Sequence, residues 1–231
     1  MKTYKHIFFD LDHTLWDFET NSRLTLEELF EEHQLHEKGI DLFERFHKTY
    51  IAINSQYWAR YHKGEISKEK LRNGRFQDTL RYFGIYDKPL AVTMANEYTE
   101  RSPFKTHLYG NAIETLDYLH KKYPLHLITN GFSEVQYVKI KNSGIHHFFQ
   151  HIFVSDEVGF QKPAPEIFRH ALDKAGCLAC QGLMIGDNMQ TDILGAKAID
   201  MDQVYFNPRR QRVFDQPTYM ISDLAELRNL L

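Results

Sequence analysis

Cysteine is nearly absent from this sequence, which contains two in 231 residues. Cys177 and Cys180 form a Cys-x-x-Cys pair, but no second ligand pair is present to complete a four-ligand zinc site, and no thioredoxin-like context surrounds them. Their position indicates the link between a helix and the strand that begins near Gly182. We therefore expect neither metal nor redox chemistry from these thiols.

Long apolar runs are also missing. No apolar stretch approaches the ~20 residues that a membrane span requires, and in the start, MKTYKHIFFD, an acidic residue stands where a signal peptide would continue its apolar run. Neither sign of charge dominates, because 28 Lys and Arg residues stand against 31 Asp and Glu residues. We expect a cytoplasmic protein that binds neither a membrane nor a nucleic-acid polymer. The sequence indicates no oligomeric state.

What the sequence does contain is a series of short apolar runs separated by helical patterns. The expected strands are His6 to Phe9, Leu125 to Ile128, His151 to Val154, Gly182 to Ile185, Gln203 to Phe206 and Tyr219 to Ile221. The expected helices among them are Ser133 to Asn142, Pro165 to Ala175, Thr191 to Ile199 and Asp223 to Leu230. Buried strands that alternate with helices predict an α/β fold with a doubly wound parallel sheet.

The connection between the first two expected strands is too long for this alternation of strands and helices. More than a hundred residues separate Phe9 from Leu125, whereas a strand-helix-strand unit needs only ~30. From about Thr20 to Arg101 the apolar spacing is helical. We predict an inserted α-helical cap domain at residues 16–104 and a catalytic core at residues 1–15 and 105–231, to which a helix at Asn111 to Tyr123 returns the chain.

Polar residues follow the apolar runs where the strands should end, and ligands bind open α/β sheets beyond these carboxyl ends. Asp10 and Asp12 follow the first run, Thr129-Asn130-Gly131 the second, and Gly186-Asp187-Asn188, with Asp192 further on, the fourth; Lys162 lies downstream of the third. Taken singly, each group is typical of a turn, a helix cap or a solvated surface. Their joint placement indicates one site.

The residue types at these strand ends suit phosphoryl transfer. Asp10, Asp12 and Asp187 gather negative charges that a hard divalent cation best relieves, and an oxygen-rich site suits Mg²⁺. Asp10 is the expected nucleophile, which would form an acyl phosphate, and Asp12 is the expected general acid and base. Thr129 and the adjacent backbone would donate hydrogen bonds to phosphoryl oxygens, and Lys162 would supply positive charge.

This ordered set resembles the haloacid dehalogenase (HAD) superfamily, whose phosphatases carry Asp-x-Asp-x-Thr, then Ser or Thr, then Lys, then Gly-Asp with a later Asp. The resemblance spans the whole chain and implies a Rossmann-like core with a helical cap. The metal ligands that it implies are Asp10, Asp12 (through its backbone carbonyl) and Asp187. The implied phosphate-binding residues are Thr129, Asn130 and Lys162. Asp192 would support the metal shell or Lys162.

Several segments resemble the pyrimidine 5'-nucleotidase-like subfamily: DLDHTLWDF, INSQYW within Ile51 to Trp58, NGRF at Asn73 to Phe76 and GFQKP at Gly159 to Pro163. This resemblance implies hydrolysis of nucleoside 5'-monophosphates, including those of noncanonical pyrimidines. His13 departs from the Gly, Asn or Asp that many members carry at this position. The catalytic set is intact, but details of substrate fit depend on this residue.

A nucleotide base would need an aromatic or apolar wall and hydrogen-bond partners at its edge. The candidates for these contacts are Trp16, Phe18, Asn54, Trp58, Arg75 and Phe76. The alternative for each is structural, because aromatic residues in a helical domain usually form its core and an arginine usually lies on a solvated face or in a salt bridge.

Other functions share part of this pattern. A sugar-phosphate phosphatase or a phosphomutase would use the same core residues and differ in the cap. A hydrolytic dehalogenase fits less well, since Asp12 and the metal carboxylates have no evident work in displacing a halide. A phospho-aspartate signalling switch would also use aspartate, threonine, lysine and magnesium, but such a module resembles a single compact domain without a large cap.

Overall fold

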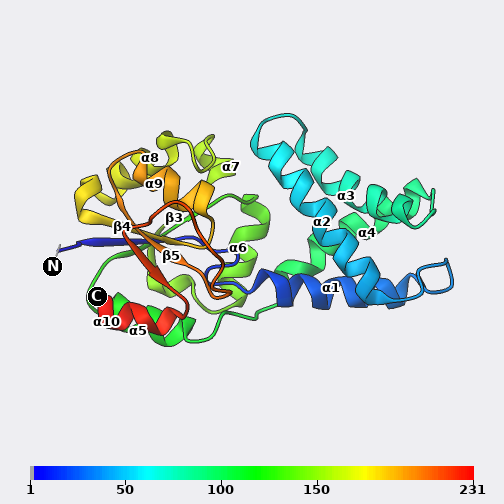
Figure 1. Ribbon diagram of the computed structural model, residues 1–231, viewed down its shortest axis with the longest axis horizontal. Coiled ribbons are helices and arrows are strands. Elements are labelled where there is room, and N and C mark those ends of the chain that lie inside the picture. The colour runs from blue at the N-terminus through cyan, green and yellow to red at the C-terminus, as the bar shows by residue number, and fades with distance from the viewer. Residues whose placement is uncertain (1–2) are drawn as a thin grey trace. The chain divides into compact units, whose positions relative to one another are not determined.

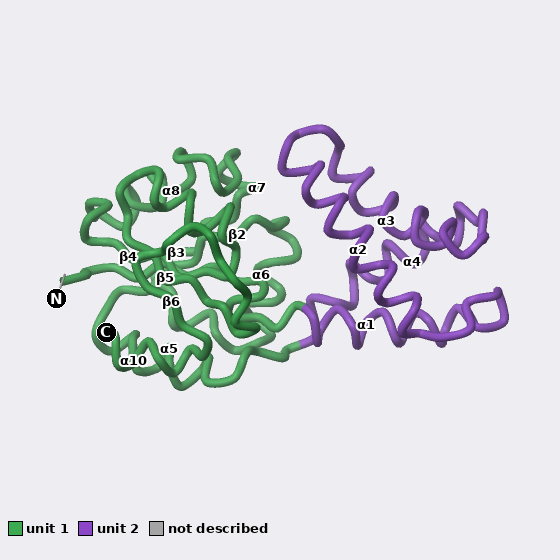
Figure 2. Tube along the Cα trace, viewed as in Figure 1, with its two compact units in different colours: residues 1–18, 106–231 green, residues 19–105 purple. Residues whose placement is uncertain are grey.

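The computed structural model describes residues 3–231 and divides the chain into two compact units. The helical unit is Glu19–Lys105, and the core unit comprises the residues up to Phe18 and those from Thr106 to Leu231 (Figure 2). The chain therefore leaves the core unit once, after its first strand and the turn that follows it, and returns once.

The core unit is built on one six-stranded sheet in the order β3-β2-β1-β4-β5-β6 (Figure 1). The strands are β1 (His6–Phe9), β2 (Leu125–Thr129), β3 (Phe149–Val154), β4 (Gly182–Gly186), β5 (Asp202–Phe206) and β6 (Tyr219–Ile221). Every neighbouring pair is parallel. The predicted doubly wound sheet is confirmed, and its strand order reverses between β1 and β4, the place where such sheets bind ligands.

Helices cover both faces of the sheet, with α8 and α9 on one side and α5 and α10 on the other (Figure 1). Their bounds are α5 (Ala112–His120), α6 (Ser133–Asn142), α7 (Ser155–Val158), α8 (Pro165–Ala175), α9 (Leu194–Lys197) and α10 (Leu227–Leu230). Successive strand residues point to opposite faces. Ile7 and Phe9 accordingly share one apolar cluster with α5, α6 and α10, whereas Phe8 lies in another with α8 and α9.

The expected helix at Thr191 to Ile199 has a different form in the structure. A π-helical turn at Met189–Ile193 precedes the short α9. Asn188 begins this turn, because its side chain accepts hydrogen bonds from the backbone N–H groups of Gln190 and Thr191 (3.0 and 3.1 Å). π-Helical turns are frequent at functional sites, and this one carries the buried Asp192.

The helical unit contains α1 (Phe18–Glu32), α2 (Phe43–His62), α3 (Lys68–Tyr82) and α4 (Lys88–Arg101), and the described residues of this unit form no strand. Ser67 and Asp87 cap α3 and α4 by accepting hydrogen bonds from backbone N–H groups in the first turn. A cluster that includes Leu29, Phe46 and Phe76 gives the unit an apolar core of its own. Such a core is what an independently folded insertion requires.

The structure bears on the expectations for the two cysteines and for membrane spans. Cys177 and Cys180 are free thiols in the link between α8 and β4, and burial raises the pKa of Cys177 to about 11, which favours the protonated thiol at neutral pH. Among the described residues, no helix is both long enough and apolar enough to cross a membrane. The cytoplasmic location stays a prediction.

Three histidines stack across neighbouring strands of the sheet. The ring centroids of His6 and His126, and those of His126 and His151, are 5.3 Å apart. His6 Nδ1 lies 3.0 Å from His126 Nε2, so one of these nitrogens carries the shared hydrogen. His126 has no exposed surface, and burial, followed by the nearby His6 and His151, lowers its pKa from 6.5 to about 3. The folded structure therefore favours the neutral form of the His126 ring in this stack.

We expect this stack to destabilise the fold in acid. Between pH 6.5 and about 3, the unfolded chain binds a proton at His126 that the folded chain does not bind, so stability falls as the pH falls, by up to about 1.4 kcal/mol per pH unit. His126→Phe keeps an apolar ring in the stack and should flatten this slope. Urea unfolding at pH 4 to 7 measures it, with His146→Phe, at an exposed position, as the control. Equal slopes in the wild type and His126→Phe would contradict the expectation.

Candidate active site

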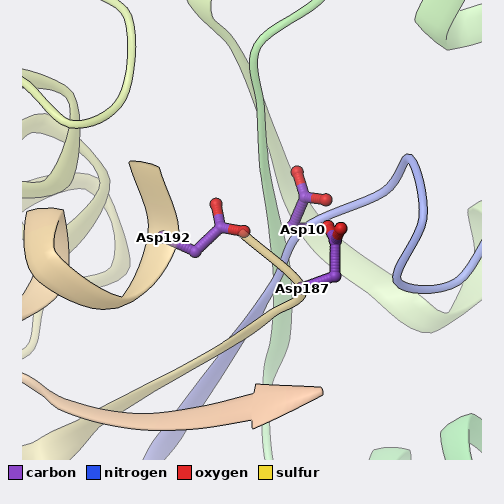
Figure 3. A group of neighbouring side chains, drawn as sticks. All are labelled: Asp10, Asp187 and Asp192. Atoms are coloured by element: carbon purple, nitrogen blue, oxygen red, sulfur yellow. The ribbon is translucent and has the colours of Figure 1, made fainter. Parts of the chain in front are cut away.

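Three carboxylates meet at the carboxyl ends of β1 and β4, where the strand order reverses. Asp10 follows β1, Asp187 follows β4, and Asp192 comes from the π-helical turn beyond. One carboxylate oxygen of each lies within 4.8 Å of the others (Figure 3). β1 and β4 are hydrogen-bonded neighbours, so the sheet itself brings together residues that are far apart in the sequence.

Lys162 lies between two of these carboxylates. Its Nζ is 2.6 Å from Asp10 Oδ1 and 2.6 Å from Asp192 Oδ1, and the lysine is only 2% exposed. Burial alone would lower the pKa of Lys162, but the charges of Asp10 and Asp192 outweigh it and raise this pKa above its usual value. Lys162 is thus a buried, charged member of the site and not a surface lysine.

The site carries more negative than positive charge. Burial raises the pKa of Asp10 to about 7, with Asp192 adding to the effect of burial and Lys162 opposing it. Burial and the charge of Asp10 also raise the pKa of Asp187. Three carboxylates around one ammonium, two of them buried and that of Asp187 partly exposed, leave an excess of negative charge that a divalent cation would neutralise. Carboxylate oxygens are the ligands that Mg²⁺ prefers. The donor set therefore fits Mg²⁺.

Thr14 joins the two strand ends and was not among the predicted site residues. Its hydroxyl accepts a hydrogen bond from the Asp187 N–H (3.0 Å) and lies 3.3 Å from Asp10 Oδ2 and 3.4 Å from Asp187 Oδ1. The turn between Asp10 and Thr14 includes His13 at a φ of 64°. Gly, Asn and Asp adopt this left-handed region most readily, which explains why they are alternatives to histidine at this position.

Asp12 lies apart from the three-carboxylate group and has partners of its own. Lys139 Nζ is 2.6 Å from its Oδ1, and Gln136 Nε2 donates to its Oδ2 at 2.8 Å. Burial would raise the pKa of Asp12, but the charge of Lys139 and the hydrogen bonds from Lys139 and Gln136 lower it. Sequence reasoning missed both partners; their spacing of one helical turn places them on one face of α6, but α6 carries little amphipathic pattern to show that this face is buried.

Thr129, the last residue of β2, and Asn130, which follows it, make different contacts. Thr129 is buried, and its hydroxyl accepts a hydrogen bond from Gln136 Nε2 at 2.6 Å. Asn130 instead holds the backbone of Lys162, since its Nδ2 donates to the Lys162 carbonyl (2.7 Å) and its Oδ1 accepts from the Lys162 N–H (2.8 Å). The Asn130 side chain therefore positions Lys162, and phosphate binding by Asn130 stays a prediction that falls to its backbone.

The chain matches the model of the haloacid dehalogenase-like hydrolase family over residues 4–200. It belongs to this family. Pyrimidine 5'-nucleotidase YjjG of Escherichia coli (strain K12) is 32% identical over 97% of this chain and 96% of its own length. Glyceraldehyde 3-phosphate phosphatase of Methanothermobacter thermautotrophicus is 31% identical over 98% of this chain and 99% of its own length. A crystal structure of the putative HAD-hydrolase YfnB of Bacillus subtilis, bound to magnesium, has a TM-score of 0.89 at 30% identity and covers 99% of both chains.

Several residues that were expected to line a base pocket of this HAD-family hydrolase lie inside its two units. Trp16 and Phe76 have no exposed surface. Their expected role as a wall for a base is wrong, because a fully buried ring has no face left for a ligand. Asn54 and Arg75 are also buried and are hydrogen-bonded to each other at 2.8 Å.

The other two candidates keep partly exposed side chains. Phe18 packs against the ring of His13, with centroids 4.7 Å apart. Trp58 contacts Tyr61 and His62, with centroids 5.8 and 5.5 Å away. Contact between either ring and a base stays a prediction.

Gly186, the last residue of β4 in this HAD-family hydrolase, has no room for a side chain. A Cβ there would lie 2.3 Å from Asp192 Oδ2. We expect Gly186→Ala to displace Asp192 from Lys162 and to destabilise the protein by about 1–3 kcal/mol, the usual effect of overpacking. Gly110→Ala is the matched control, because a Cβ at Gly110 meets nothing within 4 Å. Urea unfolding compares the two variants, and equal midpoints would refute this reading of Gly186.

Proposed function

We propose that this protein is a Mg²⁺-dependent phosphomonoester hydrolase that acts through an aspartyl-phosphate intermediate on Asp10. The observation that carries the proposal is the buried Asp10 carboxylate, held by Lys162 and Thr14 beside Asp187. A carboxylate placed next to a cation site and an ammonium can attack phosphorus, because both positive charges attract the phosphoryl group and offset its negative charge. The similarity to a pyrimidine 5'-nucleotidase and to a glyceraldehyde 3-phosphate phosphatase supports this reaction class.

Two steps would complete the reaction. In the first, an Asp10 oxygen attacks phosphorus, the bond from phosphorus to the ester oxygen breaks, and Asp12 gives its proton to the leaving oxygen. In the second, water attacks the acyl phosphate, Asp12 takes a proton from that water, and the bond between phosphorus and Asp10 breaks to release phosphate. Lys162 and the Thr129 hydroxyl would hold the phosphoryl oxygens in both steps.

Asp10 and Asp187 are the side chains that we propose as ligands for Mg²⁺, with the backbone carbonyl of Asp12. Asp192 would support Lys162, with which it forms an ion pair in the structure. When bound, Mg²⁺ supplies charge neutralisation and polarisation of a phosphoryl oxygen. The magnesium in the YfnB structure, at 30% identity, supports the choice of metal.

We propose that the helical unit acts as a cap and that the substrate is a nucleoside 5'-monophosphate, with pyrimidines preferred. The similarity to the nucleotidase YjjG along nearly the whole chain supports this substrate class. The comparable similarity to a glyceraldehyde 3-phosphate phosphatase supports a sugar-phosphate phosphatase as the second candidate. A phosphomutase or a phospho-aspartate switch would use the same core residues.

Substrate class is tested by phosphate release from nucleoside monophosphates, sugar phosphates and p-nitrophenyl phosphate, with Mg²⁺ and after its removal by EDTA. We expect activity only with the metal and the highest kcat/KM for pyrimidine monophosphates. Higher values for sugar phosphates would keep the mechanism and overturn the substrate. Release from no ester, together with stable modification of Asp10 by acetyl phosphate, would favour the signalling switch.

The roles of the two aspartates are tested by substitution to asparagine. Asp10→Asn should abolish turnover, because an amide is a poor nucleophile. Asp12→Asn should slow phosphate release by about 10²- to 10⁴-fold, since proton transfer is lost from both steps, and should leave a phosphoryl group on Asp10 that intact-mass spectrometry detects. Asp173→Asn, at an exposed position, is the control. Substantial activity in Asp10→Asn would remove the proposed nucleophile.

A further inference from the structure

One face of α6 turns two buried polar side chains toward Asp12. Gln136 and Lys139 lie one helical turn apart, are 1% and 5% exposed, and each contacts a different oxygen of the Asp12 carboxylate. We propose that Gln136 and Lys139 are positioning residues that hold this carboxylate for proton transfer. The inference rests on the proposed function, in which Asp12 is the acid and base.

Gln136 links Asp12 to the proposed phosphate site. Its Nε2 donates to Asp12 Oδ2 at 2.8 Å and to Thr129 Oγ1 at 2.6 Å, which uses both hydrogens of the amide. Because the Thr129 hydroxyl accepts this bond, its own hydrogen points elsewhere and can be donated to a phosphoryl oxygen. One side chain therefore orients both the proton-transfer group and a phosphate-binding hydroxyl.

Gly131 provides independent support for this role. A Cβ at this position would lie 2.4 Å from Cδ of Gln136 and 2.6 Å from its Nε2. Any side chain at position 131 would push the Gln136 amide away from Thr129 and Asp12. The glycine after Thr129-Asn130 thus has a physical reason that a simple turn would not supply.

Lys139 holds the second carboxylate oxygen from a buried position. Its Nζ lies 2.6 Å from Asp12 Oδ1 and 4.3 Å from the centre of the Trp16 ring. An aromatic face stabilises a desolvated ammonium, so Trp16, which has no exposed surface, supports Lys139. A lysine needed only for the stability or solubility of α6 would lie outside, as the exposed Lys141 does.

The two contacts limit rotation of the Asp12 carboxylate about its side-chain bonds. Proton transfer requires a donor within hydrogen-bond reach of the leaving oxygen. The need is greatest for an alkyl ester, whose leaving alkoxide is strongly basic, and small for p-nitrophenyl phosphate, whose leaving phenolate is stable without a proton. Loss of positioning should therefore depend on the leaving group, whereas general damage to the site should not.

The experiment compares kcat/KM for uridine 5'-monophosphate and p-nitrophenyl phosphate in Gln136→Leu, Gln136→Glu and Lys139→Met. We expect kcat/KM to fall by about tenfold or more for the alkyl ester and by less than about threefold for the aryl ester. With the aryl ester, kcat should fall while kcat/KM holds, because hydrolysis of the acyl phosphate still needs Asp12 as a base. Lys141→Met, on the exposed face of the same helix, should match the wild type.

The outcomes separate this inference from the proposed function. Equal losses on both esters, or no loss in any variant, would overturn the positioning role while leaving the phosphatase intact. No phosphate release from either ester by the wild-type protein would overturn the proposed function and this inference with it. Gln136→Glu keeps the size of the side chain and Lys139→Met tests the second contact independently, and circular dichroism melting identifies any variant that fails to fold.

Discussion

The buried ion pair of Lys162 with Asp10 and Asp192 is the interaction on which the rest of the core unit depends. A charge this far from water is tolerated only when it is paired and held in place. Asn130 fixes the backbone of Lys162 at two points, and Asn188 donates its backbone N–H to Asp192 while capping the turn that carries it. The loops after β2, β3 and β4 are thereby tied to Asp10 at the end of β1 through a single lysine, by its backbone on one side and its ammonium on the other.

The sheet could be predicted from sequence because burial on both faces leaves a simple signature. The runs that became β2 and β4 are buried at every position and are mostly apolar, with His126 in β2 as an exception that the histidine stack accommodates. Their alternation with helices indicated the parallel order. The region after Asp187 could not be predicted in the same way. Its π-helical turn carries Asp192, which pairs with Lys162, and this contact joins residues that are distant in the sequence, so no local preference reveals it.

In the candidate site, too, residues placed by the sheet topology could be predicted, whereas contacts between residues far apart in the sequence could not. Asp10 and Asp187 stand directly after buried strands, so their meeting at one edge follows from the topology. The pairing of Asp12 with Lys139 depends on which face of α6 looks toward the turn after β1, and α6 carries little amphipathic pattern to reveal this. Trp16 was misassigned for a related reason: an aromatic residue beside a motif looks the same in sequence whether it faces a ligand or a lysine.

Asp10 and Asp12, the two aspartates that we propose as catalytic, differ in their surroundings in a way that bears on how metal and substrate would complete the site. Crowding and burial raise the pKa of Asp10 to about 7, whereas Lys139 and Gln136 lower that of Asp12. The proposed roles need the reverse order, an ionised Asp10 and a protonated Asp12. A divalent cation beside Asp10 and Asp187 would lower the first pKa, and the negative charge of a phosphate ester beside Asp12 would raise the second. In the proposed mechanism, metal and substrate would thus set the protonation state that each carboxylate needs. The protein itself pairs the two carboxylates with different lysines, Asp10 with Lys162 and Asp12 with Lys139.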